Sequence, residues 1–151
     1  MSEMIEIQNV SALKSIPEDS LMVKWAEHAL DKQHLQAELT LRIVDEEEGL
    51  ALNKAWRKKN YATNVLSFPV GESLEQAPNL LGDIVVCAPV VEQEALDQGK
   101  NSDAHWAHLI VHGVLHLQGY DHESDEQAGE MELKEIQILE KIGYTNPYET
   151  N

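Results

Sequence analysis

The sequence is poor in cysteine and in aromatic residues. Its one cysteine, Cys87, lies in the apolar run IVVC, so no disulfide can form within the chain. A lone buried thiol fits a reducing compartment. One phenylalanine, three tryptophans and four tyrosines supply the aromatic side chains, so the core is expected to consist mostly of Leu, Ile, Val and Ala. The 151 residues suffice for a single core without disulfide crosslinks.

Basic residues and long apolar runs are scarce as well. The 27 acidic residues outnumber the 11 basic ones and give a formal net charge of −16. A surface of this charge favours solubility and repels nucleic acid at long range, so a function on RNA requires a local basic patch. The N-terminal MSEMIEIQNV contains no basic segment followed by a long apolar run. We therefore expect no signal peptide, no membrane span and a cytoplasmic location.

Apolar residues follow two periods, one typical of strands and one typical of helices. Alternation and short apolar runs predict strands at 3–10, 38–44, 63–69 and 82–87. Helical spacing, caps and glycines predict helices from Pro17, from Asp45 to about Lys59, from Pro89 to Gly99, over 103–119 and from Ser124 to about Ile142. Residues 70–79 are expected to form a surface loop. This mixture predicts an α+β (mixed α/β) fold with one sheet of about four strands.

Two local features refine the helix predictions. The pairs Asp45 with Glu48 and Ser124 with Gln127 are interpreted as capping boxes. The last helix is expected to turn its many acidic residues outward and its apolar residues, such as Met131, inward. The helix over 103–119 is apolar nearly all round, which predicts a buried helix.

The end of this buried helix carries three histidines, in HGVLHLQGYDH (112–122). His112 and His116 are about 40° apart around a helix and about one turn apart along it, so both rings can converge on one point. Gly119 can adopt the left-handed conformation that reverses the chain and returns His122 over the helix end. Three imidazoles with an open fourth position are typical of a catalytic zinc site. We predict one Zn²⁺ ion bound by His112, His116 and His122.

Neighbouring residues leave alternatives open. His105 and His108 lie on the same stripe, but they are far from the Gly119 turn, so they are assigned to the cleft wall or to contacts behind the ligands. Gly113 stands where zinc peptidases of the H-E-x-x-H type carry their glutamate base, which disfavours peptide hydrolysis by that route. A glycine here indicates either close packing against a strand or space for substrate beside the metal.

HGVLHLQGYDH resembles the signature of the YbeY family of bacterial metal-dependent endoribonucleases. ALNKAWRKKNYATNVLSFP (51–69) and LLGDIVVC (80–87) resemble further segments of that family, and together the matches cover most of residues 37–145. The run Asn60 to Ala62 departs from the family's usual acidic, proline-bearing sequence.

The resemblance implies a single metallo-endoribonuclease domain over residues 1–151, with a small mixed sheet flanked by helices and a metal site similar to that of metzincin peptidases. It assigns the zinc ligands to the three histidines of the signature and a cleft arginine to Arg57. It also implies single-strand-specific cleavage of ribosomal RNA, especially at the 3′ end of small-subunit rRNA, in ribosome maturation and ribosome quality control.

The residues agree with an action on phosphates. Lys54, Arg57, Lys58 and Lys59 are four of the 11 basic residues, and the first three share one helix face. The two terminal lysines fit a solvated helix end, whereas the guanidinium of Arg57 can bind phosphate through two hydrogen bonds and stabilise a transition state. The proton acceptor stays open between Asp121, a hydroxide at the metal and the substrate phosphate, and Asp121 alternatively holds a ligand imidazole in place.

Two rival functions are a zinc metallopeptidase and a non-catalytic ribosome-assembly factor with a structural zinc. The resemblance implies single-stranded rRNA as a partner. Because so few basic residues neutralise few phosphates of naked RNA, we also expect targeting to depend on the ribosome or on small-subunit assembly factors.

Overall fold

The computed structural model describes residues 4–70 and 79–148, and these ranges contain four strands and five α-helices. The prediction of an α+β fold with a sheet of about four strands is confirmed. In chain order the elements are β1 (Ile5–Asn9), α1 (Asp19–His28), the 3-10 helix η1 (Lys32–His34), β2 (Glu38–Val44), α2 (Glu46–Arg57), β3 (Val65–Pro69), β4 (Leu80–Cys87), α3 (Ala88–Gln98), α4 (Ser102–Leu117) and α5 (Asp125–Lys141). Most of the loop expected at 70–79 lies outside the described residues.

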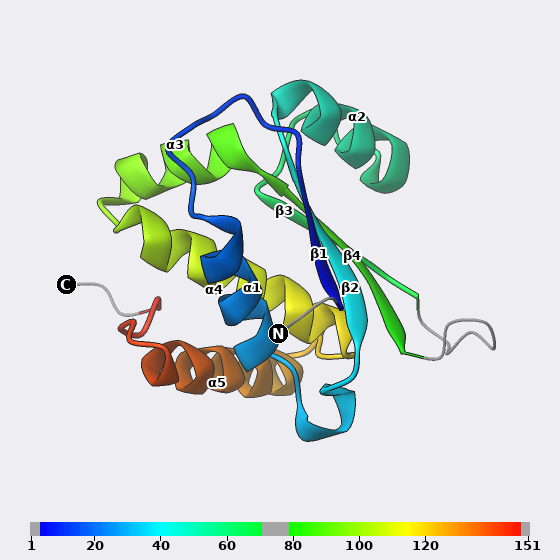
Figure 1. The fold of residues 1–151 in the computed structure, drawn as a ribbon, viewed down its shortest axis with the longest axis vertical. Coiled ribbons are helices and arrows are strands. Elements are labelled where there is room, and N and C mark those ends of the chain that lie inside the picture. Colours follow the sequence, from blue (N-terminus) through cyan, green and yellow to red (C-terminus); the bar gives the residue numbers. More distant parts are fainter. Residues whose placement is uncertain (1–3, 71–78, 149–151) are drawn as a thin grey trace.

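The strands form one mixed sheet in the order β1-β2-β4-β3 (Figure 1). β1, β2 and β4 run parallel, whereas β3 pairs antiparallel with β4. β4 therefore lies inside the sheet, as its unbroken apolar run predicts. Its side chains alternate between the two faces: Ile84 and Val86 join the larger core, and Val85 and Cys87 join a smaller apolar cluster.

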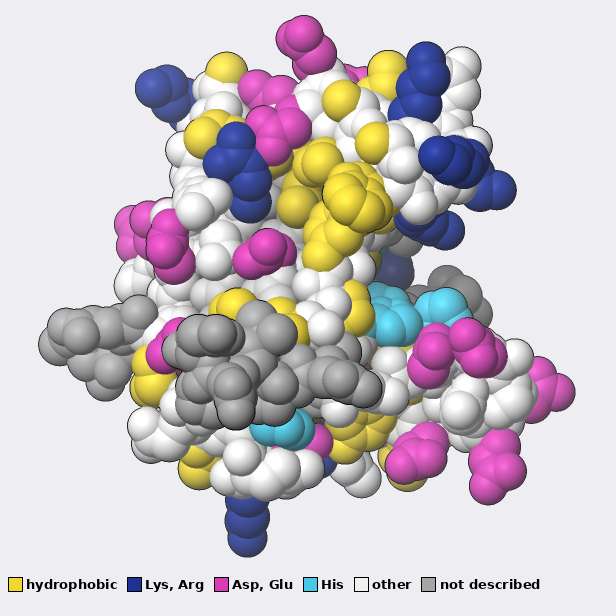
Figure 2. Space-filling view, turned by 90° about the vertical axis from the view of Figure 1, so that its right-hand side faces the viewer, with side chains coloured by type: hydrophobic (Ala, Val, Ile, Leu, Met, Phe, Trp, Pro, Cys, Tyr) yellow, Lys and Arg dark blue, Asp and Glu magenta, His cyan; other side chains and the backbone are white. Residues whose placement is uncertain are grey.

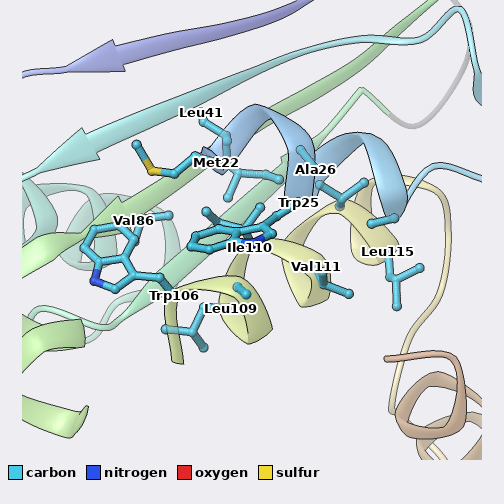
Figure 3. Packing of buried hydrophobic residues seen from close by; sticks show 14 of the residues in the cluster. Met22, Trp25, Ala26, Leu41, Val86, Trp106, Leu109, Ile110, Val111 and Leu115 are labelled. Carbon is cyan, nitrogen blue, oxygen red and sulfur yellow. The ribbon is translucent and has the colours of Figure 1, made fainter. Parts of the chain in front are cut away.

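Helices cover the two faces unequally (Figure 1). Residues of α1, α3, α4 and α5 build the larger core with one face of the sheet, and α2 packs on the smaller cluster. In Figure 3, Met22 and Trp25 of α1 lie beside Trp106 and Ile110 of α4. Ten of the 16 residues of α4 are buried, so the prediction of a buried helix is confirmed. Within the described residues, no helix is long and apolar enough to cross a membrane.

Close packing accounts for the glycine in the middle of α4. A Cβ built on Gly113 would lie 3.1 Å from Cγ2 and 3.2 Å from Cδ1 of Ile84. Ile84 is fully buried in β4, so α4 approaches the sheet at a distance at which even a methyl group would press on this side chain. Of the two explanations offered by the sequence, packing against a strand is the one that fits.

The two predicted capping boxes have different outcomes. Ser124 caps α5 as expected, because its hydroxyl accepts a hydrogen bond from the backbone N–H of Gln127. The prediction for Asp45 and Glu48 is wrong: Asp45 precedes α2 but makes no capping bond. Its carboxylate instead accepts hydrogen bonds from Ser11 Oγ and the Ala12 N–H, and Glu48 pairs with the guanidinium of Arg42 at 2.6 Å.

Candidate metal centre

A glycine turn at the end of α4 brings three histidines together. Gly119 has a φ of 101°, in the left-handed region that favours glycine. Its N–H donates to the carbonyl of His116, and the N–H of Tyr120 donates to the carbonyl of Leu115. This pair of hydrogen bonds forms a Schellman motif, which ends the helix and turns the chain back on itself. His122 thereby returns toward the face of α4 that carries His112 and His116.

The geometry of the three rings fits a shared ion. The ring of His116 lies with its centroid 4.7 Å from that of His112 and 5.1 Å from that of His122. One nitrogen from each ring lies within 4.8 Å of the others. Imidazole nitrogens suit zinc and neighbouring transition metals. The structure therefore brings the predicted ligands into a group that could hold a metal ion.

Electrostatics favours the neutral form of the central ring. Burial lowers the pKa of His116, and repulsion by His112 and His122 lowers it further. A neutral imidazole keeps the lone pair that a metal needs. The crowding of three histidines therefore favours the neutral form of His116, which is the form that can bind a cation.

The group opens to the protein surface. His112 and His116 are half-buried, and His122 is exposed. Figure 2 shows a patch of histidine side chains at the surface on the right of the view, with Lys and Arg side chains above it and acidic side chains below it. A ligand of the ion can therefore approach from solvent, on a face where both signs of charge are present.

A buried glutamate supports one of the three rings from behind. Glu135 of α5 is fully buried, and its Oε2 lies 2.7 Å from His112 Nδ1. Its Oε1 lies 2.7 Å from His108 Nε2 and also accepts a hydrogen bond from the Tyr148 hydroxyl. Burial raises the pKa of Glu135, but the hydrogen bonds from His108, His112 and Tyr148 outweigh it and lower the pKa to about 2.

Glu135 was not predicted as a site residue, because the acidic residues of the last helix were expected to face solvent. The position itself carried a signal. Glu135 stands four residues after Met131 and four before Leu139, both buried, so it lies on the apolar stripe of α5. An acid in the middle of an apolar stripe indicates a buried charge with partners elsewhere.

His105 and His108 lie outside the three-histidine group. His105 is 5% exposed, and its Nε2 lies 2.9 Å from a carboxylate oxygen of Glu94 in α3. His108 contacts Glu135, which in turn contacts His112. His108 is therefore linked to the group through Glu135, whereas His105 is part of the contact between α3 and α4.

Arg57 and Asp121 occupy different surroundings. Arg57 is the last residue of α2 and is exposed, and the following Lys58 has a φ of 60° where the helix ends. Asp121 lies next to His122, and its Oδ1 accepts a hydrogen bond from the His122 backbone N–H at 2.7 Å. That contact fixes the turn that carries His122. Among the three histidines of the group, the ring that contacts a carboxylate in the described part of the chain is that of His112, and the carboxylate belongs to Glu135.

The fold and this histidine group define a class: small α+β proteins with a candidate metal centre at the end of a buried helix. The model of one family, endoribonuclease YbeY, matches residues 6–143. Proteins named Endoribonuclease YbeY from Pseudomonas syringae pv. syringae (strain B728a) and Stutzerimonas stutzeri (strain A1501) are each 51% identical over 148 residues. These matches cover 96% of this chain, with 89% of the first relative and 92% of the second.

A solved structure shares the fold. The solution structure of TM1509 from Thermotoga maritima matches with a TM-score of 0.65 at 26% identity, covering 97% of this chain and 100% of that one. The chain thus belongs to the endoribonuclease YbeY family.

Proposed function

We propose that this chain is a zinc-dependent, single-strand-specific endoribonuclease that processes ribosomal RNA, and that residues 1–151 act as one metallo-endoribonuclease domain. The observation that carries the proposal is the convergence of three imidazoles on the open surface at the end of α4, in a member of an endoribonuclease family. The proposed zinc ligands are His112, His116 and His122.

The donor set favours zinc in a catalytic role. It offers three nitrogens, no thiolate and an exposed side at His122, which is typical of catalytic rather than structural zinc. Bound there, zinc would supply Lewis-acid polarisation of a phosphoryl oxygen and a water of lowered pKa. The exposed side weighs against a purely structural zinc in a ribosome-assembly factor.

A peptidase mechanism is disfavoured by the packing of α4. The glutamate base of an H-E-x-x-H peptidase is replaced by Gly113 here. The packing accounts for the glycine, because even a Cβ at this position would press on Ile84. Phosphodiester cleavage does not require a base at that position of the helix.

Arg57 is the proposed phosphate-binding residue. Its guanidinium is exposed, and the nearby Lys54, Lys58 and Lys59 are exposed as well. On a chain with a net charge of −16, such a group of bases is a local exception to the repulsion of RNA. A guanidinium there can hold a phosphate through two hydrogen bonds and stabilise the charge that develops on it during cleavage.

Asp121 is the proposed proton acceptor. Its Oδ1 is occupied by the backbone N–H of His122, which fixes the orientation of the carboxylate beside a proposed zinc ligand. The second oxygen, Oδ2, takes no part in that bond and can take a proton from an attacking group.

The proposed partners follow from the charge. Four clustered bases neutralise few phosphates, so affinity for naked RNA is low and a ribosomal or small-subunit assembly partner delivers the rRNA substrate.

The test is cleavage of single-stranded ribosomal RNA by highly purified protein. Arg57→Ala and His116→Ala are compared with matched controls on exposed residues elsewhere, Lys141→Ala on α5 and His28→Ala on α1. Losing a group that stabilises the transition state typically costs about 10²–10³ in rate, so Arg57→Ala should lose most activity while keeping its fold. Equal cleavage by wild type, Arg57→Ala and His116→Ala would indicate a contaminating nuclease and refute the proposal.

A further inference from the structure

The buried carboxylate of Glu135 has three hydrogen-bonding partners. One oxygen contacts His112 Nδ1, and the other contacts His108 Nε2 and the Tyr148 hydroxyl. These partners come from α4 and from the segment after α5, so one side chain of α5 bonds to two other segments of the chain. A charge this deeply buried is costly unless its partners are well placed.

The donors and acceptors in this network fix the positions of the protons. An ionised carboxylate can only accept hydrogen bonds, so each of its partners has to donate. For His112 this means that the proton lies on Nδ1, facing Glu135. In the neutral form of this ring, Nε2 then carries the lone pair and is the nitrogen left for the three-histidine group.

We propose that Glu135 is a positioning residue that holds His112 in its Nδ1–H tautomer and aims Nε2 at the metal centre, with His108 and Tyr148 fixing the carboxylate in turn. This inference rests on the proposed function, because it assigns a ligand role to His112. It replaces Asp121 as the residue that orients an imidazole, since Asp121 contacts the backbone of His122.

His108 supports this assignment. Its Nδ1 is buried and has no hydrogen-bond partner within the described part of the chain. Its Nε2 lies within reach of both Glu135 and the Tyr148 hydroxyl, at 2.7 and 3.2 Å. The ring therefore uses only the nitrogen that faces the carboxylate, and its orientation serves Glu135. Tyr148 packs edge-on against the same ring, with centroids 5.2 Å apart.

The test compares Glu135→Gln with Glu140→Gln, an exposed acid on the same helix that undergoes the same change of charge. The first readout is zinc affinity, measured by competition with a chelator on the full chain. Loss of such a supporting contact typically costs about 10–100-fold in metal affinity, so Glu135→Gln should bind zinc that much more weakly and Glu140→Gln should match wild type. Thermal unfolding of the metal-free proteins reports whether each variant folds.

The second readout is the tautomer of His112, from ¹⁵N NMR of the imidazole nitrogens in the metal-free protein. Wild type should show the proton on Nδ1, and Glu135→Gln should shift the population toward the Nε2–H form, because the amide of glutamine can donate to Nδ1. A role confined to holding α5 against α4 would leave the tautomer of a folded variant unchanged.

The outcomes separate this inference from the proposed function. An Nε2–H tautomer in wild type, or wild-type zinc affinity in Glu135→Gln, overturns the role of Glu135 even if RNA is cleaved. If His116→Ala keeps full zinc binding, the proposed metal centre is wrong, while the tautomer of His112 still reports whether Glu135 controls that ring. Measuring the tautomer of His112 in wild type requires no variant, so the inference can still be tested if Glu135→Gln fails to fold.

Discussion

Replacing Gly113 with alanine should destabilise the protein, although alanine is the better helix former. Glycine in a helix interior costs about 1 kcal/mol relative to alanine, so an open site would gain that amount. At this site the new methyl group would meet three carbons of Ile84, at 3.1, 3.2 and 3.4 Å. Ile84 is fully buried in β4, which is held by β2 on one side and β3 on the other. Neither the side chain nor the strand can therefore move aside freely.

The two effects oppose each other and packing should win. Overfilling a well-packed core typically costs about 1–3 kcal/mol. Subtracting the helix-propensity gain leaves a net loss of about 0–2 kcal/mol, and we expect about 1 kcal/mol of lost unfolding free energy. For a chain of this length that corresponds to a drop of about 2–4 °C in Tm.

Gly129 provides the matched control. It lies within α5, and its φ is not in the left-handed region. Apart from its chain neighbours and the backbone of its own helix, no heavy atom of the described residues lies within 4 Å of a Cβ built on it. Gly129→Ala should therefore raise the unfolding free energy by up to about 1 kcal/mol. Urea unfolding of both variants, freed of metal with a chelator and followed by circular dichroism, measures the two signs. Stabilisation by Gly113→Ala to the same degree as Gly129→Ala would refute the packing argument.

Three further results are expected. Burial raises the pKa of the Cys87 thiol and shields it, so a thiol reagent should react with it only when the protein is unfolded, and fast labelling of native protein would contradict this. Hydrogen bonds from Ser11 and Ala12 lower the pKa of Asp45 from its usual 3.8; its contribution to stability is therefore complete above that pH and lost as the pH falls below it. In Asp45→Asn the unfolding free energy should therefore fall less steeply as the pH is lowered, and an unchanged pH dependence would contradict this role of Asp45. Binding to naked single-stranded RNA should depend weakly on salt, with a log–log slope no steeper than about −3 if four bases neutralise phosphates, and a much steeper slope would reveal a larger RNA surface.

Local patterns in the sequence predicted the elements of this fold well. The strand expected at 38–44 is β2 (Glu38–Val44) with the same bounds, because regular alternation marks one buried face. The turn at Gly119 and the convergence of the histidines followed from helix geometry and from the freedom of glycine to adopt positive φ. Such features depend on residues close together in the chain.

Features that depend on distant partners were not predictable in this way. Asp45 and Glu48 match a capping box locally, but Ser11 and Arg42, from other strands and loops, bind their carboxylates instead. The apolar stripe of α5 indicates that Glu135 is buried, but its partners His108 and His112 in α4 do not follow from that pattern. The strand order β1-β2-β4-β3 is set by tertiary packing, which periodicity along one segment does not encode.

The central claim is that the three-histidine group holds the metal on which RNA cleavage depends. Its most direct test is a titration of zinc into metal-free protein while the cleavage rate of single-stranded ribosomal RNA is followed. We predict no cleavage without metal, a rate that rises until one zinc per chain has been added, and no response from His116→Ala under the same conditions. Cleavage by the metal-free protein, or an equal response from His116→Ala, would contradict the account.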